Sequence, residues 1–184
     1  MGARDALMGA PFFSRDLGDG ISLGLRTLDT VAELQQLAVQ NLDRLRLWEP
    51  WAQFDQSLES TRAYTEFELG RFVRGEVVPV VMYDGAVAVG SAGLKIDPSA
   101  GNAELGYWID ASSEGRGIVT RTCAALLEHA SALGIRRVEI RAATENARSI
   151  RVAERLGFER EGVLRQALQV GDRRLDLALY ARLL

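Results

Sequence analysis

The sequence is poor in the residues that build covalent cross-links and metal centres. Its 184 residues include one cysteine, Cys123, and one histidine, His129. A single cysteine excludes an internal disulfide, and one cysteine with one histidine leaves too few ligands for a zinc centre. A hydrolase built on a serine–histidine or cysteine–histidine pair would have to use His129. We therefore expect no metal in the site.

Long apolar runs and a strong charge bias are also missing. The sequence has no apolar run of 18 residues and no signal peptide with a basic start, so we expect no membrane segment and a cytoplasmic location. The net charge is −3, which gives no argument for nucleic acid or a membrane surface as a partner. The length and the 47% content of hydrophobic residues are typical of one globular domain with a sizeable core.

Apolar periodicity predicts eleven elements in the order β, α, α, β, β, β, α, β, α, β, β. Asp84-Gly85 between two apolar runs is a strong hairpin signal, and a second hairpin is expected at the C-terminal end. Helices between strands indicate parallel pairing in part of the sheet, so the class is α/β with a mixed sheet. The strands are expected at 21–27, 77–83, 86–96, 103–110, 136–142, 161–170 and 175–184, and the helices at 29–45, 57–74, 117–133 and 146–158.

The chain divides into a short lead-in and one domain. Residues 1–20 are rich in Gly, Asp and Ala and show little periodicity, although an ordered arm through Phe12 and Phe13 is left open. Without a linker or a repeat, residues 21–184 are expected to form a single domain. Ser60 or Thr61 is expected to cap the second helix.

The stretch "SSEGRGIVTRTC", residues 112–123, places two glycines at the start of a predicted helix. A helix start offers free backbone N–H groups, and glycines let a phosphate approach them. An ordinary β–α turn would have the same glycines, so both interpretations stay open. The stretch is not a Walker loop, because it lacks the pattern G-x-x-x-x-G-K-[ST]. It does not match the dinucleotide fingerprint G-x-G-x-x-G either, because Thr120 stands where the last glycine would be.

Three further stretches, "NLDRLRLWEPW", "ELGYWID" and "ENARSIRVAERLGF", occur in an order that resembles the Gcn5-related N-acetyltransferase (GNAT) superfamily. The chain is similar in particular to the RimL/RimJ branch, which acetylates N-termini of ribosomal proteins. The resemblance runs from about residue 21 to 184. It implies a mostly antiparallel seven-stranded sheet that splays between its fourth and fifth strands, four flanking helices, and acetyl-CoA as cosubstrate in the gap.

The resemblance also implies the residues that hold acetyl-CoA. The backbone of Trp108, Ile109 and Asp110 would pair with the pantetheine arm, and the loop amides would hold the pyrophosphate. Glu114 and Val119 depart from the family pattern, and Arg116 and Arg121 are expected to offset the Glu114 charge. The predicted phosphate-binding residues are Glu114, Gly115, Arg116, Gly117, Ile118, Val119 and Thr120.

Two residues of the next helix, Asn146 and Ser149, share one helical face. In similar proteins the asparagine bonds the pantetheine, and here it is also a candidate helix cap. Ser149 would protonate the departing thiolate or orient it. Many members of the superfamily carry a tyrosine as general acid at the position of Ala153.

Glu104 is the candidate general base, because several superfamily members have a glutamate at this place on the fourth strand. A structural ion pair is the alternative. The nearest RimL-type enzymes have a glutamate where this chain has Leu168, and a cysteine where it has Ala142. Other carboxylates that could face the acceptor are Glu49, Asp55 and Asp176.

The resemblance implies a protein N-terminus as the acceptor, and often a homodimer. The alternatives are a small amine such as an aminoglycoside or polyamine, or a CoA-binding module without catalysis. Trp48 and Trp51 would line the acceptor wall or pack under the first helix. His129 is expected at the surface, and Cys123 is expected to pack against the sheet.

Overall fold

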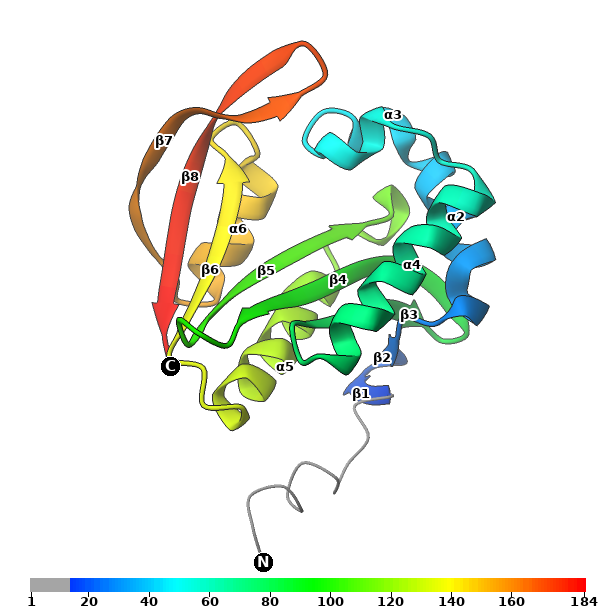
Figure 1. Cartoon of the computed structure of the whole chain (residues 1–184), viewed down its shortest axis with the longest axis horizontal. Coiled ribbons are helices and arrows are strands. Elements are labelled where there is room, and N and C mark those ends of the chain that lie inside the picture. Colours follow the sequence, from blue (N-terminus) through cyan, green and yellow to red (C-terminus); the bar gives the residue numbers. More distant parts are fainter. Residues whose placement is uncertain (1–13) are drawn as a thin grey trace, which may run out of the picture.

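The protein was analysed as a computed structural model, which describes residues 14–184 (Figure 1). The arm expected through Phe12 and Phe13 lies outside the described residues. The secondary structure consists of β1 (Ser14–Gly18), β2 (Ile21–Leu25), η1 (Leu28–Thr30), α2 (Val31–Gln40), α3 (Leu42–Leu45), η2 (Pro50–Gln53), α4 (Leu58–Val73), β3 (Val77–Asp84), β4 (Val87–Asp97), β5 (Asn102–Ile109), η3 (Ala111–Ser113), α5 (Ile118–Ala132), β6 (Arg137–Ala143), α6 (Ala147–Arg155), β7 (Glu159–Val170) and β8 (Arg173–Leu183), where η marks a 3₁₀ helix.

The strands form one mixed sheet in the order β1-β2-β3-β4-β5-β6-β8-β7. Every pairing is antiparallel except that between β5 and β6, which is parallel. The parallel pair follows from α5, which returns the chain across the sheet between the two strands. The predicted α/β class and both hairpins are confirmed.

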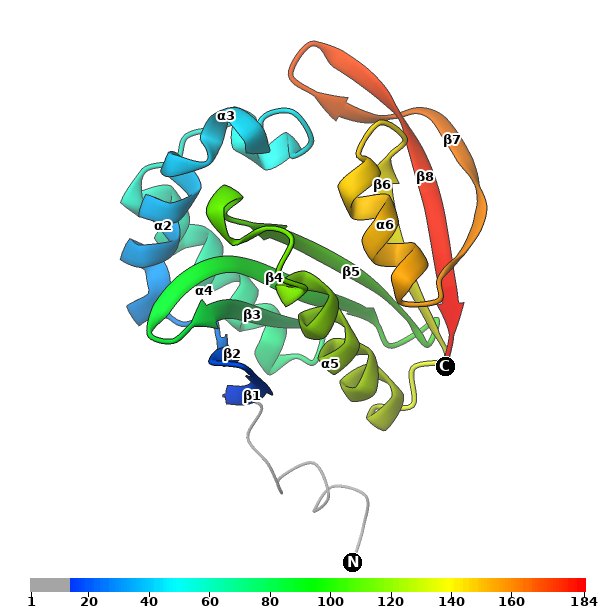
Figure 2. The same ribbon diagram turned by 180° about the vertical axis from the view of Figure 1, so that it is seen from behind.

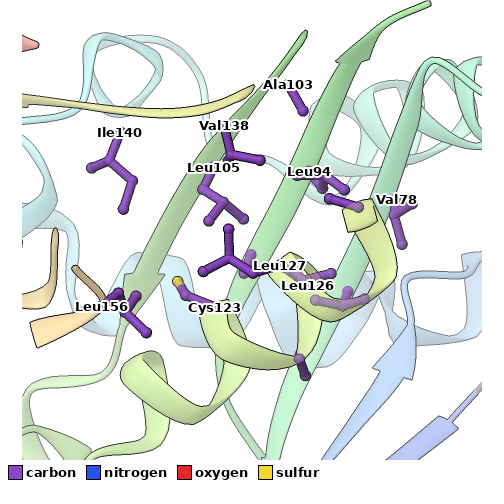
Figure 3. Packing of buried hydrophobic residues seen from close by; sticks show 14 of the residues in the cluster. Val78, Leu94, Ala103, Leu105, Cys123, Leu126, Leu127, Val138, Ile140 and Leu156 are labelled. Atoms are coloured by element: carbon purple, nitrogen blue, oxygen red, sulfur yellow. The ribbon is translucent and has the colours of Figure 1, made fainter. Parts of the chain in front are cut away.

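Helices cover both faces of this sheet (Figures 1 and 2). α2 and α4 lie on one face, and α5 and α6 lie on the other. The larger core lies between the sheet and α5, where Cys123, Leu126 and Leu127 are buried and Leu127 points toward Leu105 of β5 (Figure 3). The expected packing of Cys123 against the sheet is therefore confirmed.

The sheet opens between β5 and β6. These strands pair over four residue pairs, from Asn102↔Arg137 to Leu105↔Ile140. Beyond that point residues 106–109 pair only with β4, and residues 141–143 pair only with β8. The two strands diverge visibly in Figure 1. The predicted splay is confirmed, and it leaves one edge of β5 without a strand partner.

The described residues contain eight strands, where seven were predicted. The additional strand, β1, pairs with β2 at the edge of the sheet. It is joined to α5 by two arginines: Arg15 donates to Ala125 O at 3.3 Å, and Arg121 donates to Gly18 O at 3.1 Å. Only Leu17 of β1 packs on the core, so the segment has too little apolar alternation to be predicted as a strand.

Two helix boundaries also differ from the prediction. Ser57, not Ser60 or Thr61, caps α4, because its hydroxyl accepts a hydrogen bond from Ser60 N–H at 3.2 Å. The first predicted helix divides into α2 and α3 at Asn41. The Asn41 side chain donates to Leu37 O at 3.0 Å and bonds the chain beyond β5, so a tertiary contact holds the break.

Candidate active site

The loop after β5 presents backbone N–H groups at the start of α5. Gly115 and Gly117 have φ values of +76° and +73°, a left-handed conformation that glycine adopts without strain. The first helical hydrogen bond runs from Arg121 N–H to Gly117 O at 3.0 Å. The amides of Ile118, Val119 and Thr120 precede it and have no partner inside the helix. The loop therefore has the donors that a phosphate needs.

Asp110 fixes the beginning of this loop. Its carboxylate accepts hydrogen bonds from Ser112 N–H at 3.1 Å and from Asn41 Nδ2 at 2.7 Å. The Asn41 side-chain oxygen accepts from Ala111 N–H at 3.0 Å. Partial burial opposes ionisation, but these hydrogen bonds outweigh it and lower the pKa of Asp110. The side chain of Asn41, at the break between α2 and α3, thus holds the beginning of the loop in place.

Glu114 is neutralised by two arginines that the sequence did not single out. Its carboxylate pairs with Arg44 of α3 and, at 3.1 Å, with Arg148 of α6. The expectation that Arg116 and Arg121 offset this charge is wrong, because both have other partners. Arg116 pairs with Asp84, and Arg121 pairs with Asp19 at 3.1 Å. Glu114 therefore links helices from both sides of the opening.

Asn146 and Ser149 lie at the start of α6, beside the opening. Asn146 caps the helix, because its side-chain oxygen accepts from Ser149 N–H at 3.2 Å. The Ser149 hydroxyl lies 2.9 Å from the hydroxyl of Tyr107, which reaches α6 from β5. Burial raises the pKa of Tyr107 well above its usual range, so this phenol stays protonated. A tyrosine hydroxyl of β5 therefore lies beside the Ser149 hydroxyl.

A pocket of about 350 Å³ lies on the opposite face, between the sheet and the helices α2 and α4. It reaches β5 at Gly106, Tyr107 and Trp108, the residues that lack a strand partner on one side. Its charged lining residues are Arg26, Glu49, Asp55, Glu68 and Lys95. The sheet opening and the pocket therefore meet at the same stretch of β5.

The two tryptophans of "LWEPW" have different environments. Trp51 lines the pocket, and its ring centroid lies 6.0 Å from that of Trp108. Trp48 packs instead against Val170 and Leu175 of the C-terminal hairpin. Trp51 is therefore a pocket residue, whereas Trp48 packs in a hydrophobic cluster as the packing interpretation expects.

Glu104 lies outside this pocket, near the closed end of the splay. Its carboxylate is 3.8 Å from Lys95 Nζ and 3.6 Å from Arg141 Nε, on the strands to either side. It shares Arg141 with Glu139, which lies opposite on β6 and 2.8 Å from Arg141. Glu104 is therefore part of a ladder of ion pairs across β4, β5 and β6.

The remaining carboxylates and His129 have separate environments. Asp176 accepts a hydrogen bond from Gln166 N–H at 2.8 Å within the C-terminal hairpin. Asp55 both lines the pocket and accepts from Ser57 N–H at 3.2 Å. His129 is half-buried on α5, and burial lowers its pKa. Glu49 lines the pocket and is half-buried, and burial raises its pKa.

The described residues contain no group of three or more His, Cys, Asp or Glu side chains that could hold a metal ion. No helix within residues 14–184 is long and apolar enough to cross a membrane. An opened sheet, a glycine loop at a helix start and an adjoining pocket together define a class of protein, one that can bring a phosphate-bearing ligand and a second molecule to the same strand.

Comparison with known proteins specifies the family. Residues 22–159 match the model of the acetyltransferase (GNAT) domain, and the chain belongs to this family. It is 35% identical over 156 residues to the ribosomal-protein-serine acetyltransferase of Escherichia coli strain K12, covering 84% of this chain and 87% of that protein. The chain is accordingly an acyltransferase, an N-acetyltransferase that uses acetyl-CoA as its cosubstrate.

Solved structures support the same family. RimL, a ribosomal L7/L12 α-N-protein acetyltransferase in complex with coenzyme A, matches with a TM-score of 0.89 and 29% identity, over 92% of this chain and 97% of that one. The microcin C7 self-immunity acetyltransferase MccE, in complex with acetyl-CoA and AMP, matches with a TM-score of 0.87 and 25% identity, over 91% and 94% of the two chains.

Proposed function

We propose that this enzyme transfers an acetyl group from acetyl-CoA to the N-terminal α-amine of a protein, with a ribosomal protein as the first candidate. The observation that carries the proposal is the meeting of the sheet opening and the pocket at Gly106–Trp108. A thioester in the opening and an amine in the pocket would approach the same strand from opposite sides. The reaction would then be direct attack in a ternary complex.

The cosubstrate would be held largely by backbone groups. The pantetheine arm would lie as an extra strand along Trp108, Ile109 and Asp110, and the pyrophosphate would lie on the amides from Gly115 to Thr120. Asn146 would bond the pantetheine. A backbone N–H near Trp108 or Ile109 would polarise the thioester carbonyl.

Ser149 would supply the proton for the leaving thiolate. Tyr107 lies within hydrogen-bond distance of Ser149 Oγ and orients this hydroxyl. The amine must also lose a proton before it attacks, and two glutamates, Glu104 and Glu49, are candidates to accept it. Glu49 lines the pocket, whereas Glu104 lies outside it between Lys95 and Arg141.

A small-molecule amine is the second candidate acceptor. The pocket has three carboxylates, Glu49, Asp55 and Glu68, against two cations, Arg26 and Lys95. A pocket with this balance attracts a cationic amine such as a polyamine. MccE provides a structural relative that was solved with the nucleotide AMP as well as acetyl-CoA.

Release of free thiol from acetyl-CoA tests the proposal. The acceptor panel would contain peptides with the N-termini of ribosomal proteins, the same peptides with blocked α-amines, and polyamines and aminoglycosides. We expect thiol release with free N-termini, and mass spectrometry should place the acetyl group on the α-nitrogen. Faster turnover with a polyamine would favour the second candidate. Micromolar binding of acetyl-CoA without turnover of any amine would mean a CoA-binding module.

A further inference from the structure

We propose that Glu49, and not Glu104, is the general base that takes the proton from the acceptor ammonium. The inference rests on the acetyl transfer proposed above and assigns one of its steps. Glu49 lines the pocket that reaches Gly106–Trp108, whereas Glu104 does not. An amine in this pocket would therefore meet the carboxylate of Glu49 before it reaches the thioester.

One oxygen of the Glu49 carboxylate is fixed and the other is available. Trp51 Nε1 donates a hydrogen bond to Oε2 at 2.9 Å. Glu49 N–H donates to Leu45 O at 2.8 Å and so anchors the backbone after α3. Within the described chain no donor bonds Oε1. Because Trp51 also packs against Trp108 of β5, the carboxylate is held at a set place relative to the strand.

The surroundings of Glu49 strengthen it as a proton acceptor. Burial is the largest influence and raises its pKa, while the hydrogen bond from Trp51 and the charge of Lys95 act in the opposite direction. A base with a raised pKa binds the proton of an ammonium more readily. The other charged or titratable side chains that line the same pocket are Arg26, Asp55, Tyr64, Glu68 and Tyr107.

Glu104 has a different position. Lys95 and Arg141 lie on either side of its carboxylate, at 3.8 Å and 3.6 Å, and stabilise its negative charge. It lies at the paired end of β5, where β6 closes the sheet. An amine acetylated at Gly106–Trp108 would have to reach Glu104 through a chain of water molecules. The geometry therefore assigns Glu104 to the ion-pair ladder.

The acceptor ammonium loses two protons in the proposed reaction, one before the attack and one after it. The acceptor ammonium gives one proton to Glu49 Oε1, and the resulting amine attacks the carbonyl carbon of the thioester. The C–N bond forms, and the C–S bond breaks as the tetrahedral intermediate collapses. The Ser149 hydroxyl gives its proton to the thiolate. It then takes up the second proton of the attacking nitrogen. The products are the amide and free coenzyme A, and Glu49 returns its proton to solvent.

Two matched variants, Glu49→Gln and Glu104→Gln, test the assignment. Glutamine keeps the size of the side chain and can still accept the hydrogen bond from Trp51. We expect Glu49→Gln to lower kcat by roughly 100-fold or more, the usual contribution of a general base. Its affinity for acetyl-CoA should stay within about twofold, because the carboxylate lies on the acceptor face. Glu104→Gln should keep kcat within about threefold of the wild type.

The pH dependence of kcat/KM distinguishes a general base from a residue with a purely structural role, because only the loss of a base would change it. The base must be ionised, so kcat/KM should fall as the pH drops through the raised pKa of Glu49. This acid limb should disappear in Glu49→Gln, whose rate should instead rise tenfold per pH unit up to about pH 8, where solvent deprotonates an α-amine. In Trp51→Phe the lost hydrogen bond should move the acid limb to higher pH.

The outcomes separate the two proposals. If the wild type acetylates no amine, the proposed function fails. If the wild type is active and Glu49→Gln keeps its kcat and its acid limb, only the assignment of Glu49 is overturned. A loss confined to Glu104→Gln would identify Glu104 as the base. Thermal melting of both variants shows whether either change acts through folding.

Discussion

The loop before α5 and the pocket under α4 offer a ligand different chemistry. The loop, residues 110–120, is continuous in the chain and presents backbone N–H groups. The pocket presents side chains from separate parts of the chain, including α2, η2, α4 and β5. A site made of amides depends on backbone conformation and tolerates side chains such as Glu114. A site made of side chains depends on the identity of each one, so acceptor choice can change while the cosubstrate site stays the same.

The sharpest test of this contrast is Gly117→Val. Gly117 has a φ of +73°, and a β-branched residue there costs about 1–2 kcal/mol and places methyl groups before the amides. We expect acetyl-CoA affinity to fall by roughly 100-fold or more, about 2.8 kcal/mol, measured by calorimetry. Gly134→Val, at a φ of +78° just after α5, is the matched control and should keep the affinity. Equal binding by both variants would refute the phosphate-loop assignment.

Tyr107→Phe tests a side-chain contact on the cosubstrate face. The change removes the hydroxyl that orients Ser149 and keeps the ring. We expect kcat to fall by up to about tenfold, the value of one hydrogen bond, with little change in acetyl-CoA affinity. Tyr83→Phe is the control, because it removes a 2.6 Å hydrogen bond to Glu33 away from the opening. An unchanged kcat in Tyr107→Phe would show that Ser149 needs no partner.

Glu114→Gln should have the smallest effect. The variant releases Arg44 and Arg148 from their ion pairs at the loop. Since acetyl-CoA is a polyanion, we expect its affinity to rise by roughly two- to threefold at low ionic strength and the gain to vanish in 1 M salt. Glu128→Gln, which frees Arg15 of β1, should leave affinity unchanged. A weaker Kd in Glu114→Gln would mean that the carboxylate is needed to hold the two arginines.

Most of the fold could be predicted because its signals are local. Strand alternation, Asp84-Gly85 and the helical stripes each lie within about twenty residues and indicate the element order. The break at Asn41 was missed because its cause is a hydrogen bond to Asp110, 69 residues further along the chain. β1 was missed because it is held by arginines on its edge and on α5, and contributes a single leucine to the core.

The candidate site divides in the same way. The loop could be predicted from the spacing of its glycines, and Asn146 from its position at a predicted helix start. Each of these signals lies within one short stretch of sequence. Tyr107 is 42 residues from Ser149, and no periodicity links the two. Glu49 is visible within "LWEPW", but its burial is set by α4 and β4, which the motif does not contain. Site residues that are brought together from distant parts of the chain can therefore be identified only from the structure.

The short pairing of β5 with β6 has a consequence for the lifetime of the enzyme in the cell. A strand edge without a partner is a place where another chain can add, and proteins normally cover such edges. If acetyl-CoA fills the edge at residues 106–109, it binds the folded state alone and shifts the unfolding equilibrium. At a concentration 100 times its Kd it would add about 2.7 kcal/mol of stability. The supply of cosubstrate would then govern how much intact enzyme persists, as well as how fast it works.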